Sequence, residues 1–464
     1  MKKQELKSLL IGNGININFG GKAYSNQFII KRIIFNARAG KYDPLFNGKM
    51  SGEQIEETFL NLAEWANAIS RGECDSVVTT EEIPLLEDFK RRYSKKVEHY
   101  YDVGLEDWLF ILHIFFLKND DLKNIWRPVK YSFEQMMLDA IYNDGDIQKI
   151  YLSMGKPVKR WLEQYDEIFT LNYDNNVESL IKKPVFHLHG DYSTPANSEN
   201  PNTILGYQRT EAHQTVVVPG FEHCYCNALF DYRGENKLQV ADGFERGKES
   251  VKRLSDSGVP ASVFPAPAAG LVQTHREHPE LEIAPTYHFD EFRKLDGEIH
   301  IIGMSPNNDG HIFKLIDQST VDKVVFYFYS ESEKKQKLPL HQKVEYRSAS
   351  DLWKGLKAAP KKYSCNYDIP KSPQIDGIFD FLGEISGDPV SKADIIKEVN
   401  SIPEFRAKEL CELVDQEIKQ MDKKGSPKDE KELKWRFGEV SRIALRNGVM
   451  PAALLVHYTM TLGK

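Results

Sequence analysis

The sequence has few cysteines, no long apolar run and no excess of basic residues. Its five cysteines are scattered over 464 residues. An odd, dispersed set of cysteines does not form a disulfide framework and favours a reducing compartment. No stretch approaches the ~20 apolar residues of a membrane helix, and the apolar run near the N-terminus is too short for a signal peptide. We therefore expect a soluble, cytoplasmic protein.

The charge balance excludes an obvious nucleic-acid surface. The net charge is −7, and residues of both signs are interspersed along the chain. Proteins that bind nucleic acid by charge alone carry a basic patch or stripe, which this pattern does not predict. Small molecules or other proteins are therefore the expected partners.

Cys224 and Cys226, with His223 beside them, are the only closely spaced cysteines. They resemble half of a zinc site. A structural zinc ion normally takes four ligands, and the sequence has no second pair at suitable spacing. We therefore expect no metal.

Short apolar runs that end in glycine or small polar residues predict the strands of a buried parallel sheet. The runs are Leu6–Ile11, one ending at Leu171, one ending at Leu188, Glu298–Ile302, Val324–Tyr329 and Val344–Arg347. Between the first two, residues from about 51 to 164 show apolar positions at three- and four-residue spacing, typical of helices. The segment Leu105–Leu117 is apolar almost all round and predicts a helix buried among the others.

These patterns predict an α/β protein with an open parallel sheet, a large helical insertion and a C-terminal all-helical domain. The first domain is expected to span residues 1–358, a linker rich in Pro, Lys and Ser residues 359–373, and the helical domain residues 374–464. Helices are predicted to begin near Ser391, Pro403, Ser426 and Pro451. Within the first domain, Thr203–Tyr207 suggests a strand and Pro260–Gly270 an exposed loop or lid.

Polar side chains follow two neighbouring predicted strands. Asn172 and Asp174 follow one strand, and His189 follows the next. The carboxyl ends of strands in an open parallel sheet face one crevice, so these residues are expected to lie together. Asn, Asp and His can hold the hydroxyls of a sugar and move its protons. We predict the catalytic set Asn172, Asp174 and His189, with His187 on the same strand face as a supporting partner.

Glycines follow the first predicted strand in the run Gly12-Asn13-Gly14-Ile15-Asn16. Such a turn lets backbone N–H groups approach a pyrophosphate at the start of a helix. A dehydrogenase would carry an acidic ribose ligand about 20 residues later, at the end of a second strand. That region is helix-like and basic here, which weakens the dehydrogenase hypothesis.

Four motifs stand in order: Gly12-Asn13-Gly14-Ile15-Asn16, Thr170-Leu171-Asn172-Tyr173-Asp174, Leu188-His189-Gly190 and Gly303-Met304-Ser305 with Asp309 after it. Together they resemble the sirtuin-like superfamily, in particular its prokaryotic anti-phage branch of NAD-consuming effectors, and are similar to the AbiH abortive-infection family. The resemblance covers roughly residues 5–358.

The resemblance implies a Rossmann-like sheet that binds NAD, with Asn172 as the catalytic asparagine, Asp174 at the nicotinamide and His189 as the base. The cofactor-binding residues that it implies, from the glycine loops and the start of the following helix, are Gly12, Asn13, Gly14, Asn16, Gly303, Ser305 and Asp309. The zinc ribbon and the Gly-Ile-Pro-x-Phe-Arg stretch of deacetylating sirtuins are missing. Water, or a hydroxyl of NAD itself, is therefore the expected acceptor.

The predicted function is an NAD glycohydrolase that cleaves NAD to nicotinamide and ADP-ribose, as an abortive-infection effector that depletes NAD when triggered. The alternative is a non-catalytic nucleotide-sensing module whose C-terminal helices pass the bound state to a partner. Expected partners are NAD and either further copies of the chain or a regulatory or phage-sensing protein.

Overall fold

The computed structural model describes residues 6–358 and 392–462, except positions 81, 120, 121, 123, 124, 215, 308, 403, 423–437 and 439. The contacts within the chain divide it into two compact units. The first comprises Met1–Phe19, Pro44–Gly48 and Thr58–Ala359, and the second comprises Gly20–Asp43, Lys49–Glu57 and Pro360–Lys464. Each unit is described separately below.

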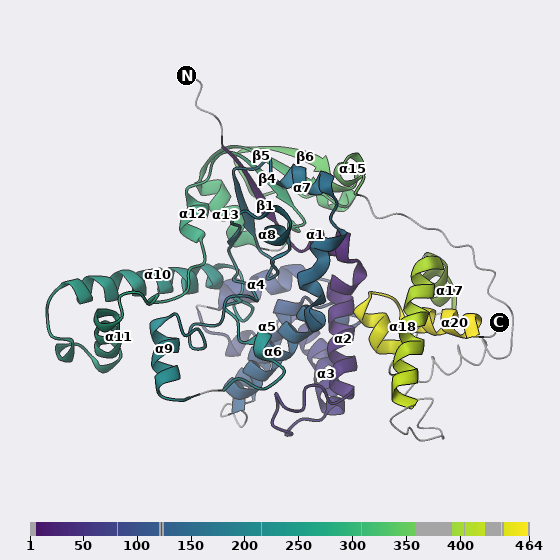
Figure 1. Cartoon of the computed structure of the whole chain (residues 1–464), viewed down its shortest axis with the longest axis horizontal. Coiled ribbons are helices and arrows are strands. Elements are labelled where there is room, and N and C mark those ends of the chain that lie inside the picture. Colours follow the sequence, from purple (N-terminus) through teal and green to yellow (C-terminus); the bar gives the residue numbers. More distant parts are fainter. Residues whose placement is uncertain are drawn as a thin grey trace. The chain divides into compact units, whose positions relative to one another are not determined.

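A six-stranded, all-parallel sheet forms the centre of the first unit (Figure 1). Its strands are β1 (Lys7–Ile11), β2 (Glu167–Thr170), β3 (Phe186–His187), β4 (Asp296–Ile302), β5 (Thr320–Phe328) and β6 (Lys343–Ser348). The strand order is β3-β2-β1-β4-β5-β6, so successive connections leave β1 first toward one edge and then toward the other. Ligands of open α/β sheets bind at such a switch point, outside the carboxyl ends of the strands. The predicted α/β class with a Rossmann-like sheet is confirmed.

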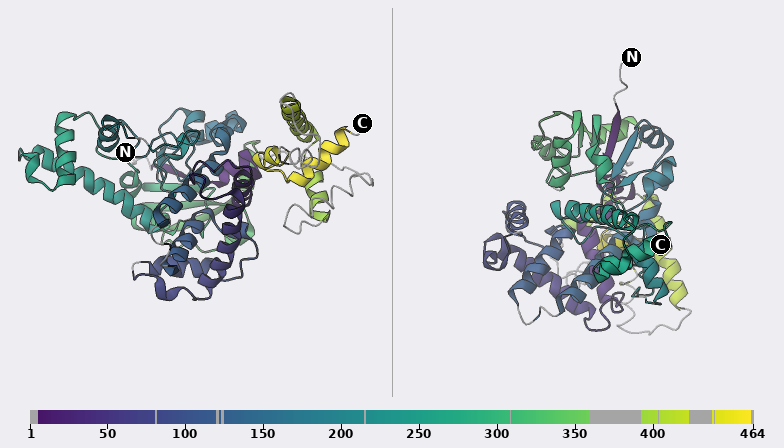
Figure 2. Two further views of the ribbon diagram at one scale, coloured as in Figure 1. Left: turned by 90° about the horizontal axis from the view of Figure 1, so that it is seen from below. Right: turned by 90° about the vertical axis from the view of Figure 1, so that its left-hand side faces the viewer.

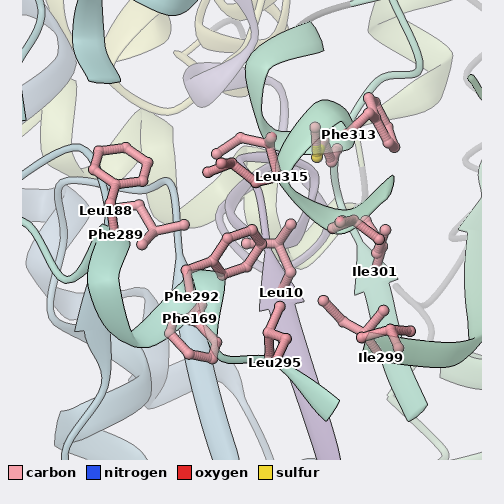
Figure 3. Packing of buried hydrophobic residues seen from close by; sticks show 14 of the residues in the cluster. Leu10, Phe169, Leu188, Phe289, Phe292, Leu295, Ile299, Ile301, Phe313 and Leu315 are labelled. Carbon is pink, nitrogen blue, oxygen red and sulfur yellow. The ribbon is translucent and has the colours of Figure 1, made fainter. Parts of the chain in front are cut away.

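One face of the sheet is packed against helices α12 (Phe289–Arg293) and α13 (Gly310–Gln318). Alternate strand residues point to this face, and Figure 3 shows Leu10, Phe169, Ile299 and Ile301 meeting the aromatic and aliphatic side chains of the helices. Full burial of each such side chain contributes roughly 1.5–3 kcal/mol. This packing holds the ends of β1, β2 and β4 next to one another.

The predicted helical insertion between the first two strands is confirmed. Its helices are α3 (Gly52–Ser70), α4 (Ile83–Arg92), α5 (Leu105–Lys118), α6 (Trp126–Tyr142) and α7 (Lys156–Leu162). Helices α1 (Gly14–Gly20) and α2 (Asn26–Arg38) precede the insertion. Helix α5 buries eight of its residues, as its apolar sequence predicts. Short 3-10 helices occur at Lys22–Tyr24, Asp75–Val77, Tyr100–Asp102, Asn143–Ser153, Glu222–Cys224 and Ala261–Val263.

Two predictions for the stretch after β3 are wrong. Thr203–Tyr207 is not a strand: helix α9 (Ile204–Glu211) begins there, because the hydroxyl of Thr203 accepts a hydrogen bond from the amide of Gly206 and caps the helix. Pro260–Gly270 is only partly a loop. Helix α11 (Ala266–Glu277) begins inside it, with a proline in the first turn, where no amide donor is needed.

The remaining helices of the first unit are α8 (Asn176–Ile181), α10 (Glu235–Asp256), α14 (Glu331–Lys335) and α15 (Ala349–Gly355). Helices α10 and α11 pack against each other and form the hairpin drawn in teal in Figure 2. Within the described ranges, no helix combines the length and apolar character needed to cross a bilayer.

The second unit contains α17 (Lys392–Ser401), α18 (Glu404–Asp422) and α20 (Pro451–Leu462), which share a small apolar core. Three of the predicted C-terminal helices are therefore present. The predicted linker 359–373 and the predicted helix start at Ser426 lie outside the described residues. Helix α2 belongs to the same unit: Arg32 donates from Nη2 to the carbonyl oxygens of Ala23 (2.7 Å) and Leu445 (3.2 Å).

Candidate functional site

Asn172 lies between the loop after β1 and the end of β3. Its side-chain Nδ2 donates to the carbonyl of Gly12 (3.4 Å), and its own carbonyl contacts Nδ1 of His187 (3.0 Å). The other ring nitrogen of His187 contacts Glu178. Burial lowers the pKa of His187, but the hydrogen bond and charge of Glu178 outweigh it and leave the pKa above its usual value. His187 therefore orients Asn172.

Asp174 ties helix α1 to the end of β2. One carboxylate oxygen accepts from Nδ2 of Asn16 (2.6 Å), and the other accepts from the amide (3.1 Å) and side chain (2.5 Å) of Asn176. Burial raises the pKa of Asp174, and these hydrogen bonds oppose the rise. Both oxygens of Asp174 thus accept hydrogen bonds. Oδ1 of Asn16, in contrast, is buried and has no hydrogen-bond partner among the described residues.

The predicted glycine loops touch each other across the switch point. The amide of Gly12 donates to Ile302 (2.8 Å), and that of Gly14 donates to Gly303 (2.8 Å). A Cβ atom on Gly303, whose φ is +76°, would lie 2.6 Å from the carbonyl oxygen of Gly12. The glycines therefore allow β1 and β4 to continue in contact beyond the sheet, and binding of phosphate by this loop stays a prediction.

The other predicted cofactor residues lie on the same loops. The carbonyl of Asn13 accepts from the amide of Ile17 (3.1 Å), and the hydroxyl of Ser305 accepts from the amide of Asn307 (3.3 Å). Asp309 precedes helix α13 in a left-handed conformation with φ 54°. Asp309 lies beside His189 and His311, with its carboxylate within 4.8 Å of their ring nitrogens.

His189 is part of a buried chain of polar groups that the sequence reasoning missed. Its Nδ1 lies 3.3 Å from Nζ of Lys237, and its Nε2 lies 3.2 Å from Nε2 of His311. Lys237 in turn donates to Glu106 (2.6 Å). These groups come from the end of β3 and from helices α10, α13 and α5. Asn172, Asp174 and His189 thus all lie at strand ends, but they have different neighbours.

Burial governs the protonation of this cluster. It lowers the pKa of His189 well below its usual value, and the charges of Lys237 and His311 add to the effect. Burial also lowers the pKa of His311 to about 3. It raises the pKa values of Glu106 and Asp309, against the charge of Lys237. Both imidazoles are therefore neutral at neutral pH.

Among the residues that the structure describes, two groups of side chains bring possible metal ligands together. The ligand atoms of Asp139, His223 and Cys224 lie within 4.8 Å of one another. In this group Nε2 of His223 lies 3.0 Å from a carboxylate oxygen of Asp139, and the thiol of Cys224 donates to the carbonyl of Gln135 (3.2 Å). Cys226, the third residue of the zinc-like sequence pattern, is not a member of the group.

The second group is His189, Asp309 and His311, again with ligand atoms within 4.8 Å of one another. The 3.2 Å between the two Nε2 atoms suits two nitrogens that each bond a cation at about 2.1 Å. A cation would need the lone pairs of both Nε2 atoms. The proton of neutral His189 would then lie on Nδ1, where it would point at the ammonium group of Lys237. Lys237 thus disfavours a cation here, and the absence of a metal stays a prediction.

Comparison of the chain with family models, curated proteins and solved structures finds no match. The fold and the site define an α/β protein with polar side chains gathered at the carboxyl ends of a Rossmann-like sheet. The relationship to sirtuin-like or AbiH proteins stays a prediction from the sequence motifs.

Proposed function

We propose that the protein is an NAD glycohydrolase that releases nicotinamide from NAD. One observation carries the proposal: Asn172 and His189 follow neighbouring strands, and Asn172 bonds to the glycine loop at the β1–β4 switch point. Dinucleotides bind at this position in doubly wound sheets. The motif resemblance adds the biological role, in which triggered cleavage depletes NAD as an abortive-infection response.

The proposed reaction needs positioning and a base rather than a metal. Nicotinamide leaves the positively charged dinucleotide as a neutral molecule, and the sugar develops oxocarbenium character that fixed dipoles stabilise. Asn172 would orient the ribose and the attacking water. His189, held neutral by burial, would supply the base through the polar chain of which it is part. Asp174 would act on the nicotinamide side through Asn16, whose Oδ1 is the unpartnered acceptor.

The test is release of free nicotinamide from NAD by the purified full-length chain, with and without lysate of phage-infected cells as a trigger. Asn172→Ala and His189→Ala should each lower the rate by about a hundredfold or more. His341→Ala is the matched control, because His341 is 68 % exposed and pairs with Asp317 at the surface. Circular dichroism verifies that every variant is folded.

A result in which the parent binds NAD but releases no nicotinamide under any condition would favour the nucleotide-sensing alternative. Parental rates in the Asn172→Ala, His189→Ala double variant would exclude these residues from catalysis. In either mechanism, the helices of the second unit are the proposed element for assembly or for contact with a regulatory partner.

A further inference from the structure

The chain of polar groups Glu106, Lys237, His189 and His311, of which the last three are buried, has a direction that follows from proton chemistry. An ammonium group only donates hydrogen bonds, so the Nδ1 of His189 that faces Lys237 must be the unprotonated nitrogen. A neutral His189 then carries its proton on Nε2 and donates it to Nε2 of His311. A neutral His311 must therefore carry its proton on Nδ1.

Nδ1 of His311 is buried and has no hydrogen-bond partner in the described part of the chain. Lys237 is completely buried, so its charged side chain lies out of contact with water. This charge fixes the direction of the hydrogen bonds from Lys237 through His189 to His311. A buried donor without a partner costs about 1–3 kcal/mol, which a bound ligand recovers by accepting the bond.

We propose that His311 presents its Nδ1–H to an oxygen atom of the bound ligand, and that Lys237 is the positioning residue that sets this polarity through His189. The ligand oxygen is an uncharged one, because the acidic side chains of Glu106 and Asp309 flank the cluster. Two cations, Lys237 and Arg92, oppose them, and Arg92 is already paired with Asp107. The identity of the acceptor rests on the proposed function: it is a ribose hydroxyl or the carboxamide of NAD rather than its pyrophosphate.

This assignment changes the role of His189. Both of its ring nitrogens are engaged, one with Lys237 and one with His311, so it acts on the ligand through His311. The chain can also move one proton outward to the ligand. When His311 gives up its Nδ1 proton, its Nε2 receives the Nε2 proton of His189, and Nδ1 of His189 receives a proton from Lys237. Lys237 is left as a neutral amine, so the chain loses the proton that the ligand gains. The same atom of His311 then becomes an acceptor.

The first test uses two variants of His311 that keep different halves of the ring. The amide of Asn places a donor where Nδ1 stood, whereas the amide of Gln places one where Nε2 stood. His311→Asn should bind NAD within about threefold of the parent, and His311→Gln about tenfold more weakly, the value of one hydrogen bond. Nicotinamide riboside, which lacks phosphate, should show the same pattern. Equal affinities for the two variants would overturn the proposal.

The second test reads the protons directly and does not depend on activity. In the full-length chain labelled with 15N-histidine, two-bond 15N–1H correlations should show His189 protonated on Nε2 and His311 protonated on Nδ1. Lys237→Met should abolish this pattern, and Lys237→Arg should restore it. Lys314→Met, on the same helix as His311 and exposed, is the control that leaves it unchanged.

His189 protonated on Nδ1 in the parent would contradict the inference. So would zinc ions, added alone, that bind at His189 and His311 and change their 15N–1H correlations, since a cation takes both Nε2 lone pairs. Zinc bound at Asp139, His223 and Cys224 would leave these correlations unchanged. If the parent does not bind NAD at all, the proposed function fails. The histidine spectrum still shows which ring nitrogens of His189 and His311 carry protons, and so decides the direction of the hydrogen bonds between them.

Discussion

Gly303 is the residue at which the two glycine loops depend on each other most directly. It adopts φ +76°, and an added Cβ would lie 2.6 Å from the carbonyl oxygen of Gly12. Gly303→Ala should therefore cost about 2–4 kcal/mol, from the left-handed conformation and the steric overlap together. Gly258→Ala is the control: its φ is +68°, but nothing lies within 4 Å, so it should cost only about 1 kcal/mol.

Urea denaturation of the two glycine variants measures the difference. Equal losses would mean that the β1 and β4 loops separate without cost, and their close approach would then not support a ligand site. A larger loss for Gly303→Ala supports a rigid switch point.

Glu134 on helix α6 gives a pH-dependent prediction. Burial, and after it the charge of Asp231, raise its pKa from 4.5 to about 8, against the opposing charge of Lys130. Because the folded pKa lies above the unfolded one, the stability from the protonated carboxyl is fully present below about pH 4.5 and is lost as the pH rises through about 8. Glu134→Gln should match the parent at pH 4.5 and exceed it at pH 9, by roughly 2–4 kcal/mol.

Thermal melts of Glu134→Gln and the parent at several pH values test this, with the exposed Glu331→Gln as the control. A constant difference between Glu134→Gln and the parent at every pH would show that the carboxyl does not titrate in this window.

At the scale of elements, helix α5 connects the core of the insertion with the site. It buries Ile111 completely and also carries Glu106, the partner of Lys237. Ile111→Ala should destabilise the chain by about 2–5 kcal/mol because it leaves a cavity. Leu152→Ala, at a position 71 % exposed, should change stability by no more than about 0.5 kcal/mol. Chemical denaturation compares them, and similar losses would show that α5 is not the core helix that its burial indicates.

At the scale of the whole molecule, the second unit joins distant parts of the chain. Arg32 on α2 donates to the carbonyl of Leu445, and a Cβ on Gly448 would lie 2.1 Å from the amide nitrogen of Ala23. Removal of residues 370–464 would therefore take away the packing partner of α2. The sequence predicts that the truncated chain still binds NAD but loses its assembly or its response to the trigger. Because Arg32 loses its contact with Leu445, we also expect the melting temperature to fall.

Light scattering, thermal melting and nicotinamide release on the truncated and full-length chains check these outcomes together. The melting temperature should fall by about 2–4 °C for each kcal/mol lost. An unchanged number of chains per particle, together with an unchanged melting temperature and triggered activity, would show that the C-terminal helices are independent of the rest.

The sequence by itself determined the kinds of elements and where the strands end. Apolar runs closed by glycine mark β1 and β4, and the continuous apolar character of Leu105–Leu117 marks α5, because burial on both sides of a strand or all round a helix leaves a local pattern. Local patterns failed at Thr203, where one side-chain hydrogen bond at a helix start outweighs an apolar run.

Only the tertiary structure decided which polar groups meet. Lys237 and Glu106 lie beside His189, Asp174 bonds to Asn16 and His187 bonds to Asn172 because of how helix faces pack on the sheet. A buried lysine has the same sequence signature as an exposed one, and the partners of Lys237 are far away in the sequence: Glu106 by 131 residues and His189 by 48. Packing sets these distances, and no spacing along the chain encodes them.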